Sequence, residues 1–311
     1  MRTILNSDAE DAPLINLSEV DEIELLILKR MREFTMGEHR SVFHGSGFDF
    51  VGLRDWQAGD RFSAIDWAQS TLTNFSPLIV REFEQPSTAS VVAVADATLS
   101  TRCGIDGVRI ATAIARAIAT IGMSAVFFQD MFGLLTFDAG FEHLEAVRPR
   151  VGKNQVIHCL DAYQHRRGLQ EVKSSDSVSR SVAGFLRKTT LIPVISDFLF
   201  EDARSLLSEL AQLNSSHDVF LVLIEASFAF ELPKISAGWV EAYDVETGRS
   251  RVVSRGALAR TASRVREWQD EVERDAKELG LDVLRLGLDT GASAVALTEF
   301  VVERRLRKGK G

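Results

Sequence analysis

The sequence predicts an α/β fold: a doubly wound and mostly parallel β-sheet that follows an irregular N-terminal subdomain. From about residue 88 onward, short apolar runs typical of buried strands alternate with longer segments that carry apolar residues at helical spacing. Strands and helices that alternate in this way form a parallel sheet with helices on both faces. The first 87 residues lack this alternation and are dense in charges, glycines and aromatic residues.

The expected elements after residue 88 follow from composition and from the residues that end each segment. The run 91–95 is short, continuous and rich in valine, as in a strand buried on both faces. The helix over 106–122 is expected to end at Gly122, because glycine is favoured at helix C-termini. The expected strands are 91–95, 124–129, 133–139, 141–147, 189–196, 217–226 and 281–288. The expected helices are 106–122, 154–165, 175–188, 201–213, 256–279 and 292–306.

The N-terminal part begins with an amphipathic helix expected over 18–34, with Ser18 as its N-cap and Asp21 three residues later. The segment 37–84 has weak periodicity, and a long structured stretch of this kind is usually functional or interfacial. We therefore expect three parts. These are 1–87, the helix with the irregular charged and aromatic segment; 88–306, the α/β domain; and 307–311, a basic tail.

The composition narrows the class of protein. The chain has 311 residues, 45% of them apolar, and a formal net charge of −8, which is typical of a globular protein without a broad nucleic-acid footprint. Cys103 and Cys159 stand in no metal-binding spacing and form no disulfide framework. The first residues lack the apolar core of a signal peptide, and no run of about 18 apolar residues occurs. We expect a cytoplasmic protein with no transmembrane segment and no nucleic-acid partner.

A carboxylate and two hydroxyls follow the first strand of the expected sheet. Asp96 ends the apolar run, and Thr98 and Ser100 come next at alternate positions. Ligands of an open parallel sheet bind beyond the carboxyl ends of its strands, where Asp197, at the end of another apolar run, can join them. This oxygen set suits Mg²⁺, which takes oxygen ligands and keeps several waters. The alternative is that Asp96 and Thr98 only cap the next helix or form an Asx-turn.

A longer pattern resembles a known family. Its positions run in order through the irregular segment: Gly45, Gly47, Asp49, Phe50, Arg54, Trp56, Gly59, Asp60, Ile65, Asp66, Trp67, Val80, Arg81, Glu82 and Phe83. With the DATLS of 96–100 they resemble domain-of-unknown-function family 58 (DUF58), directly over about 37–100 and compatibly to about 300. The resemblance implies a von Willebrand factor A-like, Rossmann-type sheet.

The resemblance also implies the metal-ion-dependent adhesion site (MIDAS) of that fold, a D-x-S-x-S run with a threonine and an aspartate from later loops. Asp96, Thr98 and Ser100 correspond to the first element and Asp197 to the last, with Mg²⁺ as the metal. The loop expected to hold the middle threonine, 150–155, has none, and Asn154 there can offer a side-chain oxygen. The site is therefore expected to be degenerate.

The charged segment admits two interpretations. Arginine–carboxylate pairs can pin its loops as a structural subdomain. Alternatively, its exposed residues form a recognition surface, because Trp and Arg are enriched at binding hot spots. The candidate partner-binding residues are Arg54, Trp56, Asp60, Arg61, Asp66 and Trp67.

Two functions follow. The resemblance implies a non-enzymatic adaptor that partners a MoxR-type AAA+ ATPase and other von Willebrand factor A-domain proteins in chaperone-like maturation or assembly, its metal ion binding an acidic side chain of the partner. The alternative is a Mg²⁺-dependent phosphohydrolase with an aspartate nucleophile. The sequence lacks a phosphate loop and a G-x-S-x-G elbow. The adaptor hypothesis expects Asp96 and Asp197 to lie together and not in a sealed interior.

Overall fold

The computed structural model describes residues 13–36, 49–57, 65–84, 89–105, 107–138, 144–172, 178–186, 188–231, 239–244 and 249–308. The chain forms two compact units, one of Met1–Arg30 with Ala89–Gly311 and one of Met31–Thr88. We expected the first helix to belong with the irregular segment in a part ending at residue 87. Its contacts instead place the larger share of that helix with the α/β unit.

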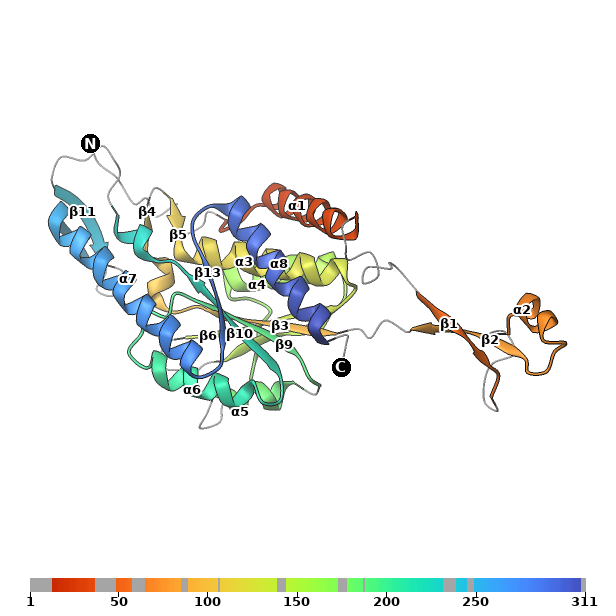
Figure 1. The fold of residues 1–311 in the computed structure, drawn as a ribbon. Coiled ribbons are helices and arrows are strands. Elements are labelled where there is room, and N and C mark those ends of the chain that lie inside the picture. Colours follow the sequence, from red (N-terminus) through yellow and green to blue (C-terminus); the bar gives the residue numbers. More distant parts are fainter. Residues whose placement is uncertain are drawn as a thin grey trace. The chain divides into compact units, whose positions relative to one another are not determined.

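The larger unit is built on a seven-stranded sheet in the order β13-β10-β9-β3-β6-β7-β8 (Figure 1). From β13 to β6 all neighbouring strands are parallel, whereas β7 runs antiparallel to both β6 and β8. The prediction of a mixed α/β unit with a mostly parallel sheet is therefore confirmed. The strands are β3 (Ser90–Asp96), β6 (Met131–Phe137), β7 (Glu145–Arg150), β8 (Gln170–Glu171), β9 (Leu191–Ser196), β10 (Asp218–Ile224) and β13 (Asp282–Leu286).

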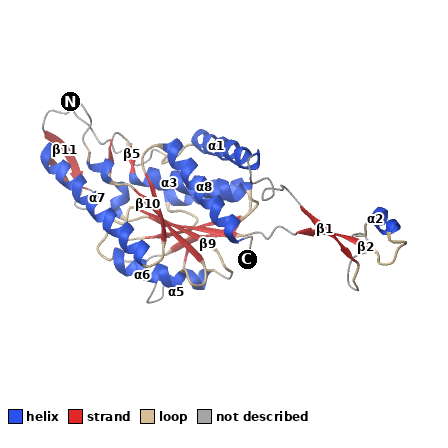
Figure 2. Cartoon of the chain, viewed as in Figure 1, coloured by secondary structure: helices blue, strands red, loops and turns tan. Residues whose placement is uncertain are grey.

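Helices cover both faces of this sheet, as Figure 2 shows. On one face α3 packs against α4 and α8, and α1 is joined to this layer by ion pairs from Arg116 of α3 and Lys153 of α4. On the other face α6 packs between α5 and α7. The helices are α1 (Leu17–Met36), α3 (Ile110–Phe127), α4 (Lys153–His165), α5 (Val178–Phe185), α6 (Ala203–Leu213), α7 (Arg255–Glu278) and α8 (Thr290–Lys308).

Helix α3 is the centre of its layer, and it corrects one prediction. The expected strand over 124–129 is wrong, because α3 continues through Gly122 to Phe127. Gly122 does not end the helix. A Cβ atom there would lie 2.7 Å from Val156 Cγ1 and 3.0 Å from Phe132 Cε1, so glycine allows α4 and β6 to pack closely on α3.

One property of α3 bears on the membrane question. Among the residues that the structure describes, α3 alone is long and apolar enough to cross a membrane by length and composition. Most of its side chains are buried inside the unit, as in the core helix of a globular protein. The expectation that the chain has no transmembrane segment stays a prediction.

Smaller elements complete the two units. The sequence analysis did not predict the strand pairs or the short helix among them. These elements are β1 (Asp49–Asp55), β2 (Ile79–Glu84), α2 (Trp67–Leu72), β4 (Gly104–Ile105), β5 (Val108–Arg109), β11 (Trp239–Asp244) and β12 (Arg249–Ser254). In the second unit β1 and β2 pair antiparallel and α2 lies in the connection between them.

Candidate functional site

The two predicted strand ends lie side by side. β3 and β9 are parallel neighbours, with Ala95 opposite Ile195 in the register. Asp96 and Asp197 follow these paired residues at the carboxyl edge of the sheet, as the sequence predicted. The Ser100 hydroxyl, from the 3₁₀ helix Leu99–Arg102, donates to Asp197 Oδ1 across 3.2 Å and joins the two loops. The four predicted metal-binding residues therefore converge.

Asp96 is held by hydrogen bonds to both carboxylate oxygens. Oδ1 accepts from the backbone N–H of Thr98 at 2.8 Å, and Oδ2 accepts from the hydroxyl of Ser196. The first contact is the Asx-turn that we weighed as the structural alternative, so Asp96 fixes the loop after β3 as well as facing the site. Thr98 Oγ1 lies 2.9 Å from Ser100 Oγ, which completes a chain of hydrogen bonds from Thr98 to Asp197.

Asp197 has one oxygen without a partner. Its Oδ1 accepts from the backbone N–H of Leu199 at 2.9 Å and from Ser100. Its Oδ2 is buried and has no hydrogen-bond partner in the described part of the chain. A buried carboxylate oxygen that lacks a donor is costly, so this atom is the position where a cation or a proton stabilises the site most.

The site is more enclosed than the adaptor hypothesis expected. Asp96 and Asp197 are both 0% exposed, and Thr98 is also buried. Ser100 is half-buried, and Leu99 beside it is 44% exposed, so these two residues form the outer surface of the site. The carboxylates thus lie together as expected, but both are fully buried, so the expectation that the site is not sealed is not met.

Burial and proximity raise the pKa of both acids. Removal from water raises the pKa of Asp96, and the hydrogen bonds from Ser196 and Thr98 offset part of that rise. For Asp197, burial and then the nearby charge of Asp96 raise the pKa from 3.8 to about 7. Near neutral pH the pair is therefore poised to hold a proton or, in its place, a cation.

The donor set fits a hard cation. It consists of two carboxylates and two hydroxyls, all oxygen, with one carboxylate oxygen unpartnered. Mg²⁺ is commonly bound through one or two carboxylates while it keeps several waters. Within the described ranges, no group of three or more His, Cys, Asp and Glu side chains is placed to hold a metal. Asp96 and Asp197 would hold Mg²⁺ here, with the Thr98 and Ser100 hydroxyls as further donors.

Asn154 lies at the other edge of the sheet. Because β7 runs antiparallel to β6, its first residue Glu145 pairs with Thr136 near the carboxyl edge and its last residue, Arg150, pairs with Phe132 near the amino edge. Asn154 is exposed in the first turn of α4, which starts at that amino edge. The hypothesis that Asn154 replaces the missing threonine is therefore wrong.

Four residues around the site were not predicted. Ser196 is fully buried and joins Asp96 to the β9 loop, and its position directly before Asp197 was the only sequence signal available. Tyr163 of α4 donates its hydroxyl to the backbone oxygen of Asp96 at 2.7 Å. Gln269 and Trp268 of α7 donate to the backbone oxygens of Asp197 and Phe198 at 2.9 and 2.8 Å. No local pattern links these helix residues to the strand ends.

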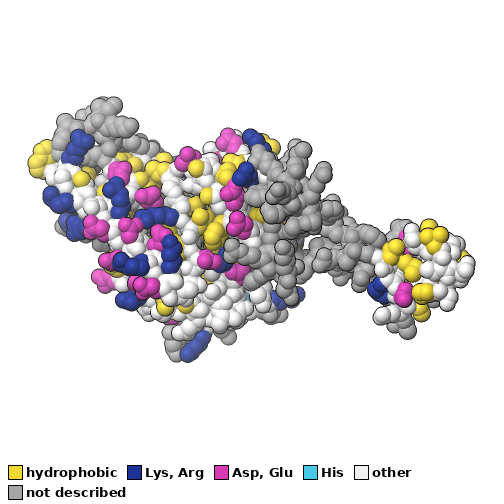
Figure 3. All heavy atoms as spheres, in the orientation of Figure 1, with side chains coloured by type: hydrophobic (Ala, Val, Ile, Leu, Met, Phe, Trp, Pro, Cys, Tyr) yellow, Lys and Arg dark blue, Asp and Glu magenta, His cyan; other side chains and the backbone are white. Residues whose placement is uncertain are grey.

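The candidate partner-binding residues of the second unit divide into different roles. Asp66 is buried and caps α2, accepting from the N–H groups of Ala68 and Gln69. Trp67 beside it is 57% exposed, and Arg54 and Trp56 are half-buried. Asp60 and Arg61 lie outside the described residues. Figure 3 shows hydrophobic side chains on the near face of the described part of this unit, where the exposed large apolar residues are Leu53, Trp67, Leu72 and Phe75.

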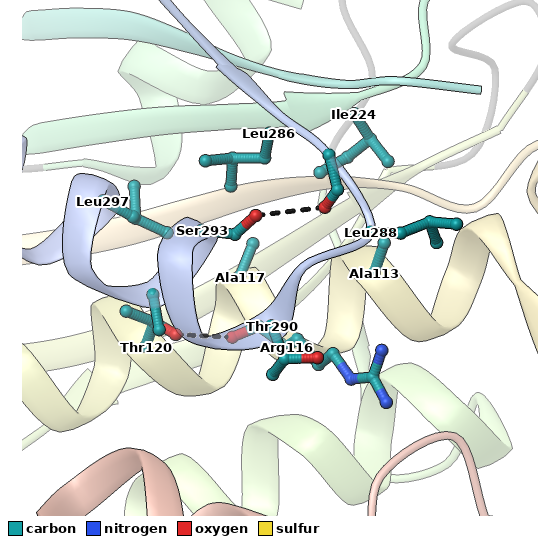
Figure 4. A pocket seen from close by; sticks show the side chains of 12 residues that line it. Ala113, Arg116, Ala117, Thr120, Ile224, Leu286, Leu288, Thr290, Ser293 and Leu297 are labelled. Carbon is teal, nitrogen blue, oxygen red and sulfur yellow. Dashed lines mark hydrogen bonds between the residues drawn. The ribbon is translucent and has the colours of Figure 1, made fainter. Parts of the chain in front are cut away.

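A small cavity elsewhere in the larger unit does not compete as a ligand site. It lies between α3, α8 and the ends of β10 and β13, lined by residues such as Ala117, Leu286 and Leu297 (Figure 4). The cavity volume is about 20 Å³, enough for roughly one water molecule. Its walls are mostly apolar, so it is a packing defect and not a second functional centre.

The comparisons with known proteins give a family and distant structural likenesses. No curated protein matches this chain. A crystal structure of the pilus adhesin SpaC from Lactobacillus rhamnosus GG is similar at 9% identity and a TM-score of 0.39, covering 72% of this chain and 31% of that one. The chain thus spans about a third of the length of SpaC. The family described as "Protein of unknown function DUF58" matches residues 52–276, more than half of the sequence, and the chain therefore belongs to the DUF58 family.

Proposed function

We propose that this protein is a von Willebrand factor A-like adaptor of the cytoplasm that binds other proteins through a degenerate MIDAS formed by Asp96, Thr98, Ser100 and Asp197. The partner is a MoxR-type AAA+ ATPase, alone or with other von Willebrand factor A-domain proteins, and the process is maturation or assembly of client proteins. The observation that carries this proposal is the convergence of two carboxylates and two hydroxyls from adjacent parallel strands, with Asp197 Oδ2 lacking a partner.

We infer two states of the site, of which the structure shows the closed one. In the closed state Ser100 donates to Asp197 and lies within hydrogen-bond distance of Thr98, and burial raises the pKa of both acids. In the open state the two hydroxyls turn from each other toward a cation. Asp96 and Asp197, with the Thr98 and Ser100 hydroxyls, would hold Mg²⁺, which would supply the positive charge that recognises an acidic side chain of the partner.

The second unit supplies a further contact surface in this proposal. Trp67 and Arg54 remain candidate partner contacts, because exposed tryptophan and accessible arginine are frequent at binding hot spots. Asp66 supports this surface indirectly, since it caps the helix that begins at Trp67. Substitution of Trp67 would therefore weaken binding of the same partner and leave the metal site unchanged.

The alternative of a Mg²⁺-dependent phosphohydrolase receives less support. A nucleophilic aspartate must reach the phosphorus atom of its substrate, and both site aspartates are 0% exposed. Asp96 also has both of its oxygens engaged with Thr98 and Ser196.

The test is affinity capture of a purified MoxR-type ATPase by the full chain, with Mg²⁺ and ATP present or with a chelator. We expect capture in Mg²⁺, loss with the chelator, and loss in Asp197→Asn. Asp130→Asn is the matched control, because Asp130 is an equally buried acid that binds the Ala89 N–H at the opposite edge. Equal capture by wild type and Asp197→Asn, or equal capture with and without the chelator, contradicts the proposal.

A further inference from the structure

The backbone oxygens of the two site aspartates are each bound by a side chain from a helix. Asp96 O accepts from Tyr163 of α4 at 2.7 Å, and Asp197 O accepts from Gln269 of α7 at 2.9 Å. α4 and α7 belong to the helix layers on opposite faces of the sheet. The two aspartates are therefore fixed from two sides by elements that are distant from them in sequence.

Gln269 is fully buried and uses every hydrogen-bonding group of its amide. The nitrogen donates to Asp197 O and also to Ile224 O at 2.8 Å, and the oxygen accepts from the N–H of Ala226 at 3.2 Å. Leu223 and Ser196 are opposite each other in the β9–β10 register, so Ile224 and Asp197 are the next pair. The amide thus bridges two strands where the sheet ladder ends, and a fully satisfied buried amide of this kind is rigid.

Tyr163 performs the corresponding role on the other side. Its side chain is buried, and its phenol hydroxyl is the donor to the Asp96 backbone oxygen. Its partner is the last residue of β3, immediately before the loop that carries Thr98 and Ser100. A shift of that backbone oxygen moves the whole loop.

We propose that Gln269 and Tyr163 are positioning residues that set the separation of Asp197 and Asp96, and hence the ability of the site to bind a divalent cation. The effect on Mg²⁺ binding rests on the proposed function. The positioning of the two aspartates by Gln269 and Tyr163 does not. Mg²⁺ requires near-ideal ligand placement, so a small backbone displacement at either aspartate would strongly lower the affinity for Mg²⁺. Residues that orient metal ligands typically change metal affinity by about 10–100-fold.

The test compares Gln269→Met and Tyr163→Phe with Gln155→Met. Gln155 is a matched control, because it is also buried and its amide donates to a backbone oxygen, that of Arg148, but near the amino edge of the sheet. The first readout is local amide hydrogen exchange without metal. The Leu199 N–H donates to Asp197 Oδ1 and the Thr98 N–H donates to Asp96 Oδ1, so each amide reports on one aspartate.

After correction for global stability, we expect Leu199 to exchange at least about tenfold faster in Gln269→Met with Thr98 unchanged, and the reverse in Tyr163→Phe. Gln155→Met leaves both amides at the wild-type rate. Equal acceleration of both amides in all three variants overturns the proposal, because it indicates general loosening. If Gln269→Met does not fold, Tyr163→Phe, which removes one oxygen atom, decides the question by the same criterion.

The second readout is Mg²⁺ affinity by calorimetry. We expect about a tenfold or larger loss in Gln269→Met and Tyr163→Phe, and less than about a twofold change in Gln155→Met. If wild type binds no Mg²⁺ while the exchange pattern holds, the positioning role stands and the proposed metal function fails. If wild type binds Mg²⁺ and all three variants bind it equally, the positioning role is refuted.

Discussion

Ionisation of the buried aspartate pair should make the stability of the fold depend on pH, and Asp197→Asn isolates that dependence. The pKa of Asp197 is 3.8 in the reference state and about 7 in the folded chain, raised by burial and by Asp96. A folded-state pKa above the unfolded one means that the native state binds the proton more tightly. This stabilisation is fully present below pH 4 and is lost as the pH rises through about 7.

The magnitude follows from the same two values. A difference of about three pKa units corresponds to roughly 4 kcal/mol in the free energy of unfolding, an upper bound because the site can relax or admit water. We therefore expect the unfolding free energy of wild type to fall between pH 5 and pH 8 by a few kcal/mol more than that of Asp197→Asn. The variant keeps an oxygen for the Leu199 N–H but cannot ionise.

The assay is urea unfolding followed by circular dichroism at pH 5, 6, 7 and 8, in a chelator, for wild type and variant. All other ionisable groups are the same in both proteins, so the difference between the two curves reports Asp197. Parallel curves would refute the argument, since they would mean that Asp197 is already ionised in the folded state throughout this pH range. At pH 8, millimolar Mg²⁺ should restore stability to wild type and not to Asp197→Asn.

Three further variants test contacts elsewhere in the two units. Gly122→Ala should lower the unfolding free energy by about 1–3 kcal/mol despite alanine's better helix propensity, because its Cβ atom meets Val156 and Phe132; an unchanged denaturation midpoint would contradict the close approach. Asp66→Ala should lower the unfolding free energy of the second unit by about 1 kcal/mol, because α2 loses its N-cap; proteolysis of that unit measures this effect. The same variant should leave Mg²⁺ affinity unchanged, as measured by calorimetry. Arg304→Ala should destabilise the larger unit by about 3 kcal/mol, because its mostly buried guanidinium pairs with Asp218 and Asp282. The exposed pair Arg274–Glu271 is the control for that measurement, and its removal should cost less than about 1 kcal/mol.

The sequence predicted the convergence of the site because the convergence depends on strand patterns alone. Asp96 and Asp197 each follow a short apolar run, and parallel strands bring their carboxyl ends to one edge. Ser196 lies directly before Asp197 and could have been predicted in the same way, since it is the last residue of β9 at that edge. The central sheet and its covering helices were predictable for the same reason.

Other features depended on tertiary packing that no local pattern records. Gly122 resembled a helix end, but its role is to admit Val156. Asn154 was assigned to the wrong edge because the reversed direction of β7 is not visible in a short apolar run. Gln269 and Tyr163 lie on helices far along the chain, and only the structure brings them to the aspartates.

The burial of the site could not be predicted from the sequence either. A carboxylate after a strand is usually solvated, and nothing in 96–100 indicates that Asp96 is fully buried. The burial changes the expected chemistry, because it raises the pKa of both acids. The second unit carries its exposed Trp67 next to a structural Asp66, a division that the motif alone leaves open.

The central claim is that Asp96 and Asp197 together hold one Mg²⁺ ion. Calorimetric titration of Mg²⁺ into the full chain at pH 8, where Asp197 is mostly ionised, measures it directly. We predict a single saturable site in wild type and in Asp130→Asn, and none in Asp197→Asn. No saturable binding to wild type, or equal binding to Asp197→Asn, would contradict the claim.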